Sequence, residues 1–137
     1  MTDKKRVLIL CTGNSARSQM AEGLLRHDAP GWDVESAGTR PSSVKPEAIA
    51  AMREVGIDIS GHRSKSVAEF EGQRFDLVIN VCDNARETCP VFFGAAERLH
   101  RSFEDPAAVE GSEEVRLAAF RRVRDELRVW LRDLCYT

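Results

Sequence analysis

The feature that most constrains this chain is residues 11–18, Cys-Thr-Gly-Asn-Ser-Ala-Arg-Ser, which lie between a predicted strand and a predicted helix. The preceding residues 6–10, Arg-Val-Leu-Ile-Leu, form a short apolar run typical of a buried strand. After the stretch, Met20, Leu24 and Leu25 recur at helical spacing. Where a strand meets a helix, successive backbone N–H groups can surround an anion, and the helix dipole adds positive potential. The stretch therefore predicts an anion-binding loop.

Four side-chain and backbone features of this loop indicate chemistry rather than packing alone. Gly13 is expected to allow a tight turn, and Asn14 to adopt a positive φ and hold the loop with its amide. Arg17 can bind two oxygens of a tetrahedral oxyanion, and Ser18 can donate a hydrogen bond to the sulfur of Cys11. The loop residues expected to bind substrate are Thr12, Gly13, Asn14, Ser15, Ala16 and Arg17.

Cys11 heads this loop, where a helix N-terminus and a nearby arginine both favour the ionised thiol. We expect Cys11 to be a thiolate at neutral pH and to act as a nucleophile. The alternative is a structural role, in which Cys11 is a small buried residue at the end of a strand. Most single cysteines have such a role. The combination of strand, Cys11, five residues, Arg17, Ser18 and helix favours the catalytic interpretation.

Length and composition limit the remaining possibilities. A chain of 137 residues with 42% hydrophobic residues predicts a single domain over residues 1–137. The net charge of −2 gives no general attraction to nucleic acid or membrane, and no apolar run approaches the roughly 18 residues of a membrane span. Only four apolar residues lie between the basic N-terminus and Cys11, too few for the apolar region of a signal peptide. We therefore expect a cytoplasmic protein whose four cysteines serve chemistry or the core.

Strands and helices alternate along the chain. Strands are predicted at 6–10, 33–38, 75–82 and 98–103, and helices at 19–26, 46–55, 67–70 and from 113 onward. This alternation predicts an α/β fold, a four-stranded parallel sheet with helices on both faces. Ligands of such sheets bind beyond the carboxyl ends of the strands. Cys11, Cys82 and Asp105 fall at or just after predicted strand ends, so we expect them to share one edge.

The last helix carries Phe120, Val123 and Leu127 on an apolar face, and arginines between them. A run of arginines suggests nucleic-acid binding. The favoured interpretation is a solvated helix face balanced by Asp125, Glu126 and Asp133, so no nucleic-acid partner is expected.

Cys82 and Cys89 form a second candidate group. Their spacing differs from that of zinc-binding cysteines, and neither His62 nor His100 is spaced to complete a site, so no metal is predicted. In a helix their Cα atoms would be about 10 Å apart, whereas a disulfide needs roughly 4.4–6.8 Å. They could form a redox pair only if the polar segment between them unwinds or loops.

Asp105-Pro106 alone is typical of an ordinary turn. Beside a cysteine nucleophile, however, Asp105 could protonate a leaving oxygen as a general acid. Cys135 is interpreted as core or terminal filling.

These motifs together resemble a known family. Residues 11–18 resemble the phosphate loop of low-molecular-weight protein tyrosine phosphatases, and Asp105-Pro106 matches that family's general acid in position and order. Cys82 and Cys89, followed by Pro90, are similar to the two extra cysteines of thioredoxin-coupled arsenate reductases of the same three-layer fold. The likeness extends from the first strand to the last helix.

The resemblance implies a mechanism for arsenate reduction. Cys11 attacks arsenate held by the loop amides and Arg17, while Asp105 protonates a departing oxygen. Cys82 then attacks Cys11 and releases arsenite, and Cys89 attacks Cys82 and frees Cys11. Thioredoxin reduces the resulting Cys82–Cys89 disulfide, so electrons come from a partner protein and no bound cofactor is expected. The catalytic residues implied are Cys11, Arg17, Ser18, Cys82, Cys89 and Asp105.

The sequence departs from related proteins at two places. Phosphatases of this fold carry aromatic residues after the acid, whereas residues 106–109 are Pro-Ala-Ala-Val. Some related reductases bind potassium beside the loop, and Asn14, Glu22 and Ser36 match three of the ligand positions. The fourth position, acidic in those proteins, is Lys65 here, so we expect the lysine ammonium to replace the cation.

Three functions remain open at this point. The first is arsenate reduction by a monomer that uses thioredoxin, with glutaredoxin as the other possible donor. The second is a phosphatase for small phosphomonoesters or phosphoproteins, which would not need Cys82 and Cys89. The third is an oxyanion sensor that binds without turnover.

Overall fold

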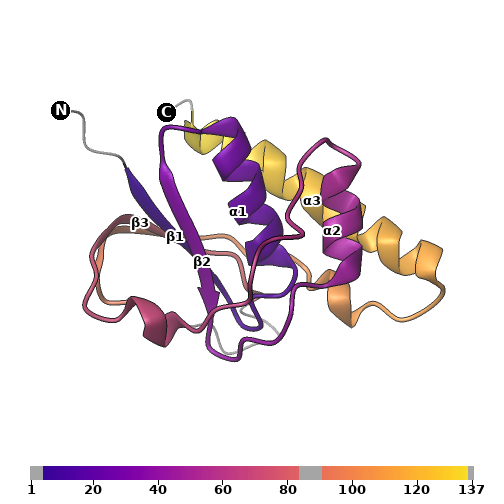
Figure 1. Cartoon of the computed structure of the whole chain (residues 1–137), viewed down its shortest axis with the longest axis horizontal. Coiled ribbons are helices and arrows are strands. Elements are labelled where there is room, and N and C mark those ends of the chain that lie inside the picture. The colour runs from indigo at the N-terminus through magenta and orange to yellow at the C-terminus, as the bar shows by residue number, and fades with distance from the viewer. Residues whose placement is uncertain (1–4, 84–90, 136–137) are drawn as a thin grey trace.

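The structure is a computed structural model that describes residues 5–83 and 91–135 (Figure 1). Its elements in chain order are β1 (Arg6–Cys11), α1 (Arg17–Asp28), β2 (Asp33–Gly38), α2 (Pro46–Arg53), the 3₁₀ helix η1 (Val67–Phe70), β3 (Phe75–Asn80), β4 (Ala95–His100), the 3₁₀ helix η2 (Pro106–Ala108) and α3 (Glu113–Cys135). The four strands form one parallel sheet in the order β2-β1-β3-β4, which confirms the predicted sheet.

The apolar run of β1 occupies the centre of the sheet, between β2 and β3. Because both of its edges are paired and both faces are covered, residues 7–11 are buried. On one face, Val7 and Ile9 belong to a core cluster with residues of α1, α2 and α3, and these three helices lie together in front of and beside the sheet in Figure 1.

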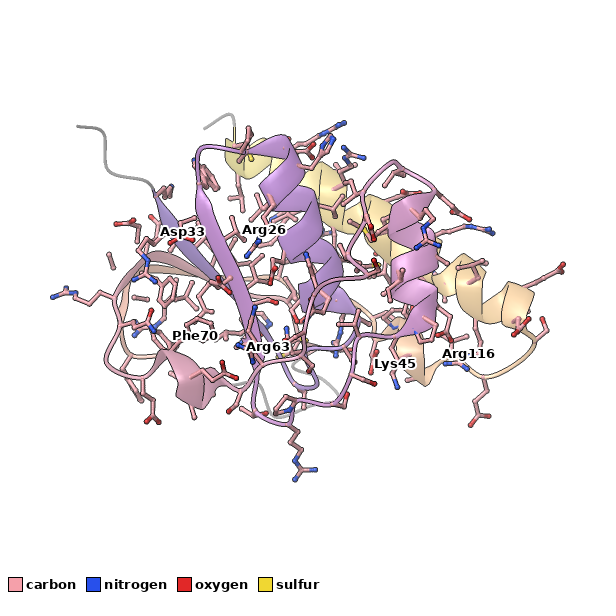
Figure 2. All side chains as sticks on the ribbon, viewed as in Figure 1. Arg26, Asp33, Lys45, Arg63, Phe70 and Arg116 are labelled. Carbon is pink, nitrogen blue, oxygen red and sulfur yellow. The ribbon has the colours of Figure 1, made fainter. Side chains whose placement is uncertain are left out.

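The opposite face carries a smaller cluster built around Leu8 and Leu10. Phe70, labelled in Figure 2, comes from η1 and meets Phe75 edge-on with ring centroids 5.9 Å apart. Phe75 also meets Phe92 at 5.6 Å. The sheet therefore has helices on both faces, with three α-helices on one side and the 3₁₀ helix η1 on the other.

The predicted starts of α2, η1 and α3 are confirmed, whereas α1 extends beyond the predicted 19–26 and α2 ends at Arg53 rather than at residue 55. Pro46 opens α2, and Gly56 follows that helix with φ at +80°, which glycine adopts at little cost. The Ser66 hydroxyl accepts a hydrogen bond from the Ala68 amide at the start of η1. The Ser112 hydroxyl accepts from the Val115 amide at 3.2 Å, as expected for an N-cap of α3.

The predicted bounds of two strands are wrong. β3 ends at Asn80 rather than at residue 82, although the Val81 amide still donates to the Leu10 carbonyl. β4 spans Ala95–His100 instead of 98–103 because it is an edge strand with mostly exposed side chains, so it lacks an apolar run. Phe103, which suggested the later position, is buried in the core cluster beyond the strand.

The arginines of α3 form ion pairs with carboxylates that come mainly from other parts of the fold. Arg121 binds Glu54 just after α2, and Arg128 binds Asp28 at the end of α1. Arg116 reaches from the first turn of α3 to Glu47 at 2.9 Å (Figure 2). These contacts fasten α3 to the α1 and α2 region. Within residues 5–83 and 91–135, no helix is both long and apolar enough to cross a membrane.

Candidate active site

The loop at residues 12–16 connects the carboxyl end of β1 to α1, as the sequence predicts, and Cys11 is the last residue of β1. Asn14 has φ at 46°, whereas Gly13 does not adopt the left-handed conformation, so Asn14 makes the unusual turn of the loop. On β2, Gly38 lies so close to the loop that a Cβ there would collide with the Thr12 carbonyl oxygen. Position 38 therefore requires glycine.

A directed series of hydrogen bonds ends at the sulfur of Cys11. Asn14 Nδ2 donates to Ser18 Oγ at 2.8 Å, and Ser18 Oγ lies 2.8 Å from Cys11 Sγ. Ser18 accepts from Asn14 and has one hydrogen of its own, which can be donated to the sulfur. All three side chains are buried.

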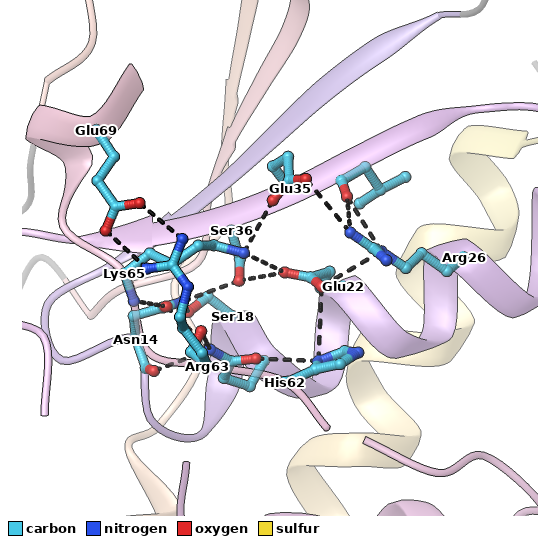
Figure 3. A network of polar contacts seen from close by, with 12 residues as sticks. Asn14, Ser18, Glu22, Arg26, Glu35, Ser36, His62, Arg63, Lys65 and Glu69 are labelled. Carbon is cyan, nitrogen blue, oxygen red and sulfur yellow. Dashed lines mark hydrogen bonds and ion pairs between the residues drawn. The ribbon is translucent and has the colours of Figure 1, made fainter. Parts of the chain in front are cut away.

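The same Asn14 amide connects this series to a buried carboxylate (Figure 3). Its second hydrogen goes to Ser36 Oγ at 2.9 Å, and Ser36 Oγ donates to Glu22 Oε1 at 2.6 Å. Each hydroxyl both accepts and donates, so the bonds polarise one another along the series. The Glu22 carboxylate can only accept, so it fixes the direction of the bonds at its end of the series, and Cys11 lies at the other end.

Glu22 is only 2% exposed and is surrounded by three basic side chains, of which Lys65 and Arg26 balance its charge (Figure 3). Lys65 Nζ lies 3.5 Å from Oε1, while Arg26 Nε at 3.3 Å and His62 Nδ1 at 3.5 Å approach Oε2. Lys65 also binds Glu35 at 2.8 Å. Burial lowers the pKa of His62, with Glu22 opposing that shift, so the imidazole is neutral at pH 7.

The residues at this position do not fit a potassium ion. The ammonium of Lys65 stands within 3.5 Å of the Glu22 carboxylate, and a cation there would meet a like charge. No group of three or more histidine, cysteine or acidic side chains in the described part of the chain is arranged to hold a metal ion.

Arg17 and Asp105 lie together beside the loop. Arg17 is 3% exposed, and its Nη1 donates to the Phe103 carbonyl at 3.2 Å. Its Nη2 lies 3.8 Å from Asp105 Oδ2. Asp105 is not at a strand end, as the shifted β4 already shows; it caps η2 instead, where Oδ1 accepts from the Ala107 amide at 3.0 Å. The Asp105 side chain is 38% exposed, so it faces both Arg17 and solvent.

Cys82 follows β3 at the same edge of the sheet as Cys11. Leu10 of β1 is paired with Asn80 of β3, and adjacent parallel strands are about 5 Å apart. Cys11 comes one residue after Leu10, and Cys82 comes two residues after Asn80. Both belong to one core cluster. The Cys82 carbonyl accepts from His100 Nε2 at 3.0 Å, which gives His100 a structural role.

The remaining cysteines differ in state and position. Cys82 is disulfide-bonded, whereas Cys11 and Cys135 are free thiols. Burial raises the pKa of the Cys135 thiol, which agrees with its interpretation as part of the core edge. Cys89 lies among residues 84–90, outside the described residues, so its role stays a prediction.

Sequence reasoning missed Glu35 and Gln19. Glu35 pairs with Lys65 across 30 positions, and the Gln19 amide Nε2 contacts the Arg63 carbonyl across 44. Neither residue belongs to a local motif. The available signal was the alternation of side chains along β2, in which Glu35 lies between two buried residues. This alternation predicts which neighbours of Glu35 are buried, but it does not predict that Glu35 pairs with Lys65.

The arrangement unites a cysteine nucleophile, an arginine and a carboxylic acid at a backbone loop built for an oxyanion. A comparison with protein families matches residues 6–137 to the model described as low molecular weight phosphotyrosine protein phosphatase. The chain belongs to this phosphatase family. The match covers every strand and helix of the fold.

Several proteins named arsenate reductase are similar to this chain over most of its length. The arsenate reductase of Halalkalibacterium halodurans is 47% identical over 126 residues, which is 91% of each chain. The arsenate reductase of Staphylococcus aureus strain N315 is 44% identical over 93% of each chain. A solved structure described as an arsenate reductase in the phosphate binding state has 36% identity, a TM-score of 0.81 and 95% coverage of both chains.

Proposed function

We propose that this protein is an arsenate reductase that transfers the oxidation of Cys11 to Cys82 and then to Cys89. The observation that carries the proposal is the placement of Cys11, hydrogen-bonded to Ser18 at 2.8 Å, in one core cluster with Cys82. A phosphatase needs the first of these residues but not the second. The relatives named arsenate reductase support the same conclusion.

The first step forms a sulfur–arsenic bond. The Cys11 thiolate attacks arsenate, whose oxygens are bound by the loop amides and Arg17, and an oxygen departs as water after Asp105 supplies a proton. Arsenic remains As(V) in this adduct. In this step the Arg17 guanidinium binds the oxyanion, and its Nη2 lies 3.8 Å from Asp105 Oδ2. The acid and the substrate are therefore neighbours of the same guanidinium.

The second step carries the redox change. The Cys82 thiolate attacks the sulfur of Cys11, the sulfur–arsenic electron pair stays with arsenic, and arsenite leaves as As(III). A Cys11–Cys82 disulfide results. Cys89 then attacks Cys82, which returns Cys11 as a thiolate and leaves a Cys82–Cys89 disulfide. A disulfide-bonded Cys82 beside a free Cys11 fits the state after this last exchange.

A dithiol protein must then return two electrons to the chain. Thioredoxin is the proposed donor, since the resolving cysteines within the chain remove the need for an external thiol in the intermediate step. No bound cofactor takes part. The reaction starts from reduced thiols, which the cytoplasm maintains, so we propose that compartment.

A phosphatase is the second candidate, because the same loop holds phosphate in any phosphomonoester reaction. Pro106, Ala107 and Ala108 form η2 directly after Asp105, so this segment offers no aromatic ring to stack on phosphotyrosine. Hydrolysis also gives no role to Cys82, which lies at the same edge of the sheet as the nucleophile. We therefore favour reduction, with weak hydrolysis of small phosphomonoesters as a side activity.

The deciding experiment follows arsenate-dependent NADPH oxidation in the presence of thioredoxin and thioredoxin reductase. Arsenite-producing turnover that requires both proteins is expected, together with little hydrolysis of p-nitrophenyl phosphate. Replacing thioredoxin by glutaredoxin, glutathione and glutathione reductase identifies the donor. Hydrolysis without arsenate reduction would establish the phosphatase, and binding without either reaction would establish a sensor.

A further inference from the structure

The carbonyl groups of the oxyanion loop are all held from outside the loop. The hydrogen bonds are Arg40 N to Thr12 O at 2.9 Å, Ser42 N to Gly13 O at 3.3 Å, Ser64 Oγ to Gly13 O at 3.1 Å, Gln19 Nε2 to Asn14 O at 3.2 Å and Lys45 N to Ser15 O at 2.9 Å. Four consecutive peptide units are therefore bound through their oxygens.

This pattern determines where the loop N–H groups point. In a trans peptide the carbonyl and the following N–H face opposite directions, and no described peptide bond is cis. Holding the Gly13 oxygen outward turns the Asn14 N–H inward, and holding the Asn14 oxygen outward does the same for the Ser15 N–H. Inward N–H groups are the donors that an oxyanion needs.

Two of these anchors are side chains. Ser64 belongs to the segment before η1, and its hydroxyl accepts from the Ser42 amide at 3.0 Å while donating to Gly13. It therefore joins the oxyanion loop to the segment at 40–45. A hydroxyl that accepts on one side and donates on the other has a fixed orientation.

Gln19 is the second side-chain anchor and is completely buried. Its Nε2 shares two hydrogens among three acceptors, the Asn14 carbonyl, Asn14 Oδ1 at 2.9 Å and the Arg63 carbonyl at 3.0 Å. Its Oε1 accepts from His62 Nδ1 at 3.1 Å, which fixes the orientation of the amide. Gln19 thus connects α1 to both the oxyanion loop and the segment that carries Ser64.

We propose that Ser64 and Gln19 are positioning residues that orient the N–H groups of Asn14 and Ser15 toward the bound oxyanion. This proposal depends on the proposed function in one respect: it takes residues 12–16 as the site that binds the oxyanion. Neither side chain touches the substrate. Their loss should weaken oxyanion binding at all stages of the reaction, which raises KM and leaves kcat nearly unchanged.

Direct binding of inorganic phosphate tests this without any redox step. Phosphate dissociation constants are measured by calorimetry for the reduced parent, Ser64→Ala, Ser64→Thr and Gln19→Leu, each well below its unfolding temperature. Ser64→Ala is expected to bind about fivefold more weakly, because one hydrogen bond orients the peptide. Ser64→Thr keeps the hydroxyl and should bind as the parent does. Gln19→Leu should bind at least as weakly as Ser64→Ala.

A matched control is Ser43→Ala, which removes an exposed hydroxyl from the neighbouring loop and should leave phosphate affinity unchanged. Amide NMR adds a local readout: phosphate should shift the Asn14 N–H strongly in the parent and weakly in Ser64→Ala. Unchanged affinity and an unchanged Asn14 shift in both Ser64→Ala and Gln19→Leu would overturn the proposal. If the parent itself fails to bind phosphate, the oxyanion site and the proposed function fail instead.

Discussion

The hydroxyl of Ser18 lies 2.8 Å from the sulfur of Cys11 and accepts a hydrogen bond from Asn14 Nδ2 at 2.8 Å, so its own hydrogen can be donated to the sulfur. The first turn of α1 therefore places a donor beside the sulfur that attacks the substrate in the proposed reaction. Charge-assisted hydrogen bonds are stronger than neutral ones, so this contact should matter for the rate.

Replacing Ser18 by alanine should slow arsenite formation roughly 10- to 100-fold, since a hydrogen bond to a charged group contributes about 1.5–3 kcal/mol. The measurement is the single-turnover rate with saturating arsenate. Alkylation of Cys11 by iodoacetamide at pH 7 should slow in parallel. Equal rates for Ser18→Ala and the parent would show that Cys11 does not depend on this donor.

Asp105→Asn should lower kcat roughly 100-fold, because the amide retains the shape of the side chain but cannot supply the proton for the departing oxygen. The phosphate dissociation constant should change less than threefold, since the loop amides and Arg17, rather than Asp105, hold the bound oxyanion in the proposed mechanism. The comparison needs both measurements on one preparation. An unchanged kcat would remove Asp105 from the mechanism.

Lys65 should make the protein independent of potassium. The unfolding temperature of the parent should be the same in KCl and in choline chloride at equal ionic strength. Lys65→Met should lose about 3 kcal/mol of stability, because the buried Glu22 carboxylate then lacks its ammonium partner. A rise in parental stability or rate that is specific to potassium would contradict replacement of the ion by Lys65.

Acid should weaken the attachment of α3 through Glu54. Hydrogen bonds from Arg121 lower the pKa of Glu54 from 4.5 to about 2, so the folded state binds fewer protons than the unfolded state between these values. This contribution to stability is complete above pH 4.5 and is lost as the pH falls toward 2. Urea unfolding from pH 6 to 2.5 should show a smaller loss of stability for Glu54→Gln than for the parent.

Local patterns were sufficient where one short segment determines its own structure. The positive φ of Asn14, the caps at Ser66 and Ser112 and the bounds of β2 all follow from neighbouring residue types. The fourth strand was misplaced because β4 is an exposed edge whose residues carry no apolar alternation. Strand pairing, rather than side-chain pattern, determines where such a strand begins.

The surroundings of Glu22 required the fold. Its partners Arg26, His62 and Lys65 come from α1 and from a connector some 40 positions away. The sequence predicted Lys65 only through its resemblance to a cation site, and it gave no sign that Glu35 shares that ammonium. Long-range polar contacts of this kind depend on how loops cross, which no periodicity encodes.

The most direct test of the account is a single-turnover reaction of fully reduced Cys89→Ser with excess arsenate, stopped in acid and analysed for arsenite and disulfides. Transfer of oxidation from Cys11 to Cys82 predicts one arsenite per chain and a Cys11–Cys82 disulfide, while Cys82→Ser under the same conditions should release none. Equal arsenite release from Cys82→Ser, or no arsenite from Cys89→Ser, would contradict the transfer between these two sulfurs.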